Sequence, residues 1–136
     1  MKKANFFIRV DLTANFLFAL LWFFYPKELL KFNFDTKSYD DIHIHFSKVL
    51  AITSLASGMI SHYALNKNCP ATKAKILSIK LLAYILLLFT MMVDNLSSNL
   101  MSDKHVAFGM FGIVLLIMNC YLGLRSLKKY IRINPM

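Results

Sequence analysis

The chain has 136 residues and a formal net charge of +9, and 57% of its residues are apolar, with a mean hydropathy of +0.52. Only 17% are charged, against about a quarter in a soluble domain, which excludes an ordinary globular protein. The Lys and Arg residues lie at the ends of apolar segments, so the positive charge indicates membrane topology and not nucleic-acid binding. The composition therefore predicts an all-α integral membrane protein.

The first apolar segment, residues 6–25, ends in a cluster of aromatic residues followed by Pro26, a pattern typical of a membrane interface. Two lysines near its start also suit a secretory signal peptide. Arg9 and Asp11 interrupt the apolar region, however, and no small-residue cleavage site follows. We therefore expect an uncleaved membrane span and, after it, a short surface helix over residues 26–32.

Three further apolar segments predict three more spans. Residues 106–124 contain no charged residue, and nineteen helical residues rise ~29 Å, about the thickness of the hydrocarbon core. Residues 76–93 contain only Lys80, one turn from the start of the segment, where a long side chain can reach the interface. A capping-box pattern predicts a helix over residues 39–65, with residues 46–64 in the membrane.

The distribution of Lys and Arg predicts the orientation of this four-span chain. The segments on the side of the two termini hold 11 of these residues, and the segments on the opposite side hold 5. Because basic residues are enriched in cytoplasmic segments, we expect both termini on the cytoplasmic side. The prediction is one transmembrane domain over residues 1–136, folded as a four-helix bundle.

Polar residues of the inner half of the bundle fall at similar depth. The set is Asp11, Asn15, Ser61, His62, Lys80 and Asn119. Placing an ionisable residue inside a membrane costs free energy, and such a residue usually faces the bundle interior together with a partner. This candidate intramembrane layer therefore indicates either a structural ion pair of Asp11 with Arg9 or Lys80, or a pathway for ions or protons.

A second candidate layer lies at the outer rim and comprises Asp41, His45, Asp94 and His105. Asp41 and His45 share a helical face, and the group has the ligand types of a zinc site, a histidine pH sensor or a haem site. None of the spacings is diagnostic of a metal, so we expect a solvated rim with no metal and no cofactor. Cys69 and Cys120 also lack ligand spacing and are predicted to be free thiols.

No enzyme motif is present in the sequence, which favours a non-enzymatic function. The leading interpretation is an accessory subunit, assembly factor or scaffold that acts through helix packing. Its expected partners are the lipid bilayer and either a membrane protein or a second copy of the chain. The alternatives are a small ion- or proton-coupled transporter that uses Asp11 and Lys80, and a membrane enzyme that uses the outer histidines.

Overall fold

The computed structural model describes residues 1–33, 41–98 and 103–133, with side chains described for residues 1–31, 44, 45, 47–93 and 110–133. This part of the chain is all-α, as the composition predicts. Its five helices are α1 (Lys2–Phe24), α2 (Pro26–Asn33), α3 (Asp41–Asn66), α4 (Pro70–Ser98) and α5 (Asp103–Ile133).

The helix boundaries follow local sequence signals. Prolines begin α2 and α4, where the ring is tolerated because the first helical N–H has no intrahelical acceptor. The short helix expected after the first span is confirmed as Pro26–Asn33. The expected capping box pairs Ser38 with Asp41. Ser38 lies outside the described residues, and α3 begins at Asp41.

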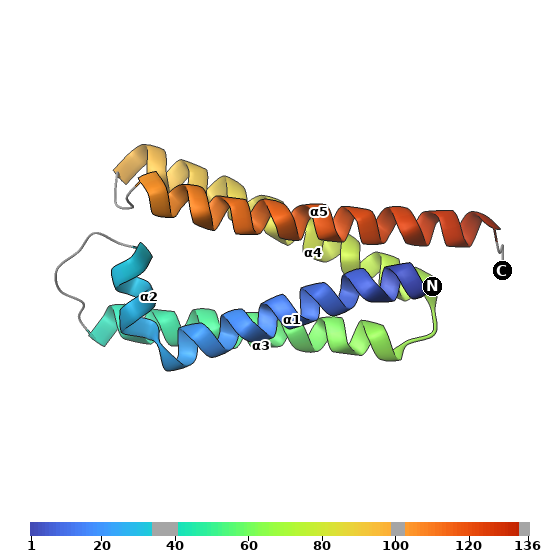
Figure 1. The fold of residues 1–136 in the computed structure, drawn as a ribbon, viewed down its shortest axis with the longest axis horizontal. Coiled ribbons are helices and arrows are strands. Elements are labelled where there is room, and N and C mark those ends of the chain that lie inside the picture. The colour runs from blue at the N-terminus through green and yellow to red at the C-terminus, as the bar shows by residue number, and fades with distance from the viewer. Residues whose placement is uncertain (34–40, 99–102, 134–136) are drawn as a thin grey trace.

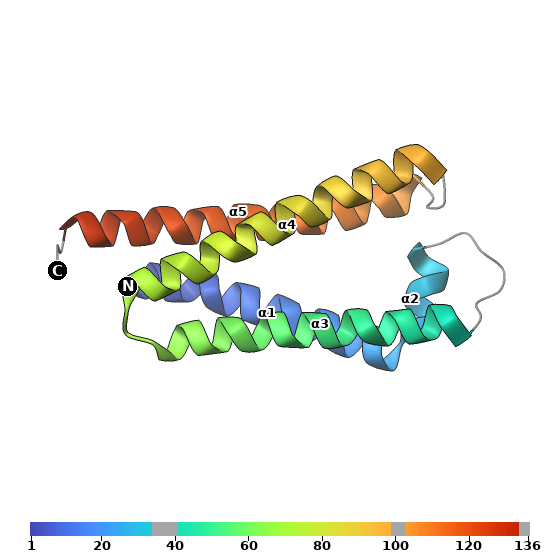
Figure 2. The ribbon, with the colours of Figure 1, turned by 180° about the vertical axis from the view of Figure 1, so that it is seen from behind.

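The four long helices run up and down as two antiparallel pairs, α1 with α3 and α4 with α5 (Figures 1 and 2). α1 also packs against α5, which joins the pairs. The pairs lie closest at the end that holds the start of α1 and the end of α5, and they draw apart towards the end that holds α2 (Figure 1). The two ends of the described chain therefore lie on the same side of the bundle.

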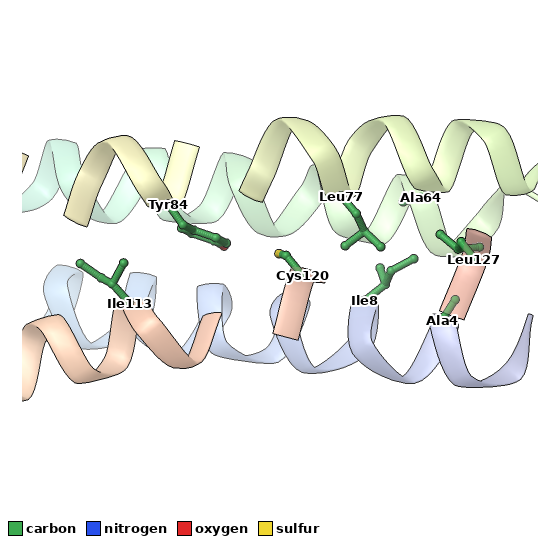
Figure 3. Close-up of a cluster of buried hydrophobic side chains, with 8 residues drawn as sticks. All are labelled: Ala4, Ile8, Ala64, Leu77, Tyr84, Ile113, Cys120 and Leu127. Atoms are coloured by element: carbon green, nitrogen blue, oxygen red, sulfur yellow. The ribbon is translucent and has the colours of Figure 1, made fainter. Parts of the chain in front are cut away.

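Each long helix buries one narrow stripe. In α1 the buried positions follow one another in steps of three or four residues, which is the spacing of one face of a helix: Ala4, Ile8, Asp11, Asn15, Ala19 and Trp22. In α5 the buried Ile113, Cys120 and Leu127 follow at intervals of seven. The stripes of all four long helices contribute to one core, drawn in Figure 3.

The outer surface of the bundle is apolar. Large side chains such as Phe6, Phe89 and Phe111 are 60% exposed or more, a pattern expected of helices that face lipid. Three helical segments are long and apolar enough to cross a membrane: Lys2–Phe24, Pro70–Val93 and Met110–Ile133. The membrane character of the chain rests on these three segments.

Candidate functional site

A buried carboxylate on α1 is the centre of the candidate site. Asp11 is fully buried, and its two oxygens accept hydrogen bonds from side chains of two other helices. Ser61 on α3 donates to Oδ2 at 2.5 Å, and Tyr84 on α4 donates to Oδ1 at 2.6 Å. Lys80, also on α4, forms a salt bridge with Oδ2. Asp11 therefore joins α1 to both α3 and α4.

Asn15 completes the cluster one turn further along α1. Its Nδ2 donates 2.8 Å hydrogen bonds to the Tyr84 hydroxyl and to the Asp11 backbone carbonyl. The Tyr84 hydroxyl therefore donates to the carboxylate and accepts from the amide. We call Asp11, Asn15, Ser61, Lys80 and Tyr84 the Asp11 cluster. Its hydrogen bonds lie within the bundle, as buried polar groups require.

The sequence assigned four of these five residues, all except Tyr84, to one layer. In the structure Ser61 and Lys80 contact the Asp11 carboxylate, and Asn15 bonds to the Asp11 backbone carbonyl. The sequence analysis did not single out Tyr84, because this residue lies in a long apolar segment that is typical of a lipid-facing span. The available signal was its position four residues after Lys80, which puts both side chains on the same face of α4. In Figure 3 the Tyr84 side chain points into the space between the helices.

Two other residues of the expected inner layer do not join the cluster. His62 is exposed, and its Nε2 lies 3.0 Å from the Nδ2 of Asn66 on the same helix. Asn119 on α5 donates a 2.8 Å hydrogen bond to the backbone carbonyl of Phe7. Asn119 therefore links α5 to α1 at a separate point.

A second buried cation was not expected from the sequence. Lys73 on α4 is 1% exposed, and its Nζ lies 2.6 Å from Asn5 Oδ1 on α1 and 3.5 Å from the Leu65 carbonyl in the last turn of α3. The sequence counted Lys73 only among the basic residues on the side of the two termini, together with the neighbouring Lys75, which is exposed. The Lys73 ammonium ties together three helix ends, and the carbonyl end of α3 favours its charge.

The expected outer layer lies largely outside the described side chains, which do not include those of Asp41, Asp94 and His105. His45 is exposed on α3. Within the described residues there is no group of three or more His, Cys, Asp or Glu side chains that could hold a metal ion. The solvated, metal-free rim therefore stays a prediction.

The arrangement of the Asp11 cluster can specify how the helices pack. In a low-dielectric interior an unpaired carboxylate or ammonium is strongly destabilising, so Asp11 and Lys80 favour only packings in which they meet. Ser61 and Asn15 add directional bonds that restrict the register further. Polar contacts of this kind stabilise helix association in membranes, where the lipid supplies no hydrophobic driving force between helices.

Comparison with known proteins identifies a family but no function. No curated protein and no solved structure is significantly similar to the chain. The family described as "Domain of unknown function (DUF8292)" matches residues 1–125, a stretch that contains the whole Asp11 cluster and Lys73. Because this match covers most of the chain, the protein belongs to the DUF8292 family.

Proposed function

We propose that α3 is a fourth membrane span and that both termini are cytoplasmic. α3 has 26 residues, enough for ~39 Å of helix, and it packs along the length of α1 (Figure 2). Buried positions of α3 are occupied by the small residues Ser47, Gly58 and Ser61. Small and polar residues at helix contacts are typical of membrane bundles.

The proposed topology predicts the accessibility of Cys69 in the loop between α3 and α4. In intact cells a membrane-impermeant maleimide should leave Cys69 unmodified until the membrane is permeabilised. The thiol is exposed, and the hydrogen bond with the Thr72 hydroxyl, followed by that with the Thr72 backbone N–H, lowers its pKa, so a larger thiolate fraction reacts near neutral pH. Cys120 is fully buried and should not react.

A single-cysteine variant supplies the matched control. Lys31 is exposed on α2, at the opposite end of the bundle, so Lys31→Cys combined with Cys69→Ser should react without permeabilisation. If both sites react from outside, α3 does not cross the membrane. If only Cys69 reacts from outside, α3 crosses but the orientation is inverted.

We infer that the protein acts through helix packing, as an accessory subunit, assembly factor or scaffold in the membrane. The observation that carries this proposal is that the polar groups of the Asp11 cluster bond to one another. The Asp11 carboxylate accepts hydrogen bonds from Ser61 and Tyr84 and pairs with the Lys80 cation. This arrangement favours a role in holding α1, α3 and α4 in one register over a role in binding a transported ion.

An ion- or proton-coupled carrier is the second candidate. It is favoured by one observation, the presence of the ionisable groups Asp11 and Lys80 in the interior of helices that are long and apolar enough to span a membrane. Such residues commonly mark ion or proton pathways. Four helices rarely enclose a pathway alone, so this candidate requires an oligomer.

Purification in mild detergent tests the two candidates against each other. We expect one stoichiometric membrane partner to copurify with the wild-type chain. The double variant Asp11→Asn, Lys80→Met should retain this partner, because it removes both charges and keeps the fold. A pure homo-oligomer, together with a gradient-dependent ion or proton flux in proteoliposomes that the double variant abolishes, would instead establish the carrier.

A further inference from the structure

The last turns of α5 form a strongly basic surface. Arg125, Lys128, Lys129 and Arg132 are all exposed, and we call these four residues the α5 basic end. We propose that the α5 basic end binds the headgroups of anionic phospholipids. The inference rests on the membrane span of α5, but it depends neither on which side is cytoplasmic nor on the accessory role.

The length of α5 places these cations in the headgroup region. The helix has 31 residues, or ~46 Å, whereas the hydrocarbon core is ~30 Å thick, so several turns must lie outside the core. The end of α5 extends past the start of α1 in both views of the ribbon (Figures 1 and 2). The four cations lie within the last nine residues of this helix.

Packing against the bundle directs the cations outward. Leu127, in the middle of the α5 basic end, is fully buried in the core cluster that also contains Ala4 and Ile8 of α1 (Figure 3). Tyr130 and Ile131 are half-buried. One side of this segment is therefore held on the protein, and the basic side chains occupy the remaining surface.

The charge of this end of the bundle is not balanced by acidic side chains. Exposed cations of α1, of α4 and of the loop between α3 and α4 add to it: Lys2, Lys3, Lys67 and Lys75. Residues 1–11, 65–80 and 125–136 contain one acidic residue, Asp11, and this residue is buried and paired with Lys80. An acidic group that pairs with these cations would therefore come from outside these three segments.

Phospholipid fits this surface better than a soluble polyanion or an acidic protein. Exposed apolar side chains, among them Tyr121 and Leu122, lie on α5 directly before Arg125. This order along one helix, apolar and then basic, matches the order of acyl chains and headgroups in a bilayer. Clusters of four to eight basic residues next to a membrane span are typical of sites for anionic lipid.

The proposal can be tested with the full chain in bilayers of defined composition. We would reconstitute it in phosphatidylcholine nanodiscs with a minor fraction of phosphatidylglycerol and measure the association of spin-labelled phosphatidylglycerol relative to spin-labelled phosphatidylcholine. The wild-type chain should favour the anionic lipid by a factor of roughly five at low salt, which corresponds to one fully engaged cation near an anionic surface. High salt should reduce the preference.

Two variants, which remove four and three positive charges from opposite ends of the bundle, show where the anionic lipid binds. Replacing all four residues of the α5 basic end with Gln should remove most of the preference, while circular dichroism and thermal unfolding show that the variant keeps its helices. Replacing the exposed Lys27, Lys31 and Lys48 near the opposite end with Gln should leave the preference intact.

Three results would overturn the inference. The first is an absence of preference for the anionic lipid by the wild-type chain. The second is an equal loss of preference in the two variants. The third is binding of a soluble polyanion, such as single-stranded DNA, by the detergent-solubilised chain without any lipid preference. Failure of the chain to enter nanodiscs at all would instead contradict its membrane placement, and the inference would fall with it.

Discussion

Asp11→Asn, with Lys80 retained, should lower the free energy of unfolding in detergent by ~3 kcal/mol, because it leaves a buried ammonium without its counter-charge. Lys80→Met should have a similar effect, since the Asp11 carboxylate then keeps only neutral donors. The double variant should recover part of the loss. The two residues are in direct contact, so their coupling should reach ~1–3 kcal/mol, measured by SDS-induced unfolding of the four proteins.

Arg9 supplies the matched control for this cycle. It lies two residues before Asp11 on the same helix, carries the same charge as Lys80 and is exposed. Arg9→Gln should therefore change the free energy of unfolding by less than ~0.5 kcal/mol. If the effects of Asp11→Asn and Lys80→Met simply add, the ion pair contributes no coupling. A large effect of Arg9→Gln would make Arg9 the functional counter-ion.

Gly123→Leu should lower the free energy of unfolding by ~2 kcal/mol through overpacking. A Cβ atom at Gly123 would lie 3.2 Å from the Phe7 Cβ of α1 and 2.9 Å from the Leu77 Cδ1 of α4. The tip of Leu77 can rotate, but the Phe7 Cβ is attached to the α1 backbone, so the larger side chain must push α5 away from α1. The measurement is the same SDS-induced unfolding.

Gly112 on the same helix is the control for this substitution. A Cβ atom at Gly112 meets no described atom within 4 Å, and the residue is exposed on the outer face of α5. Gly112→Leu should be neutral or slightly stabilising, because leucine has the higher helix propensity. Equal destabilisation by the two substitutions would show that the contact of α5 with α1 is not tightly packed.

The level of each polar residue along the bundle axis could be derived from the sequence. The neighbour that each side chain faces could not. Asp11, Ser61 and Lys80 were placed at one level because the rise per residue of a helix is constant. Ser61 and His62 are adjacent and therefore at nearly the same depth, yet they point about 100° apart, and only Ser61 faces the cluster. Apolar residues surround both positions, so hydrophobic periodicity does not distinguish them.

The sequence by itself determined that the chain is helical and apolar, where the four long helices and the short α2 lie, and which residues are available at the inner depth. These properties depend on local composition, helix signals and length. Only the tertiary structure decided which side chains meet, because that depends on the rotation of each helix about its axis and on the neighbours it packs against. Tyr84 and Lys73 show the reason: neither stands out in the sequence of α4, and each becomes a buried partner of α1 only once the helices have assembled into the bundle.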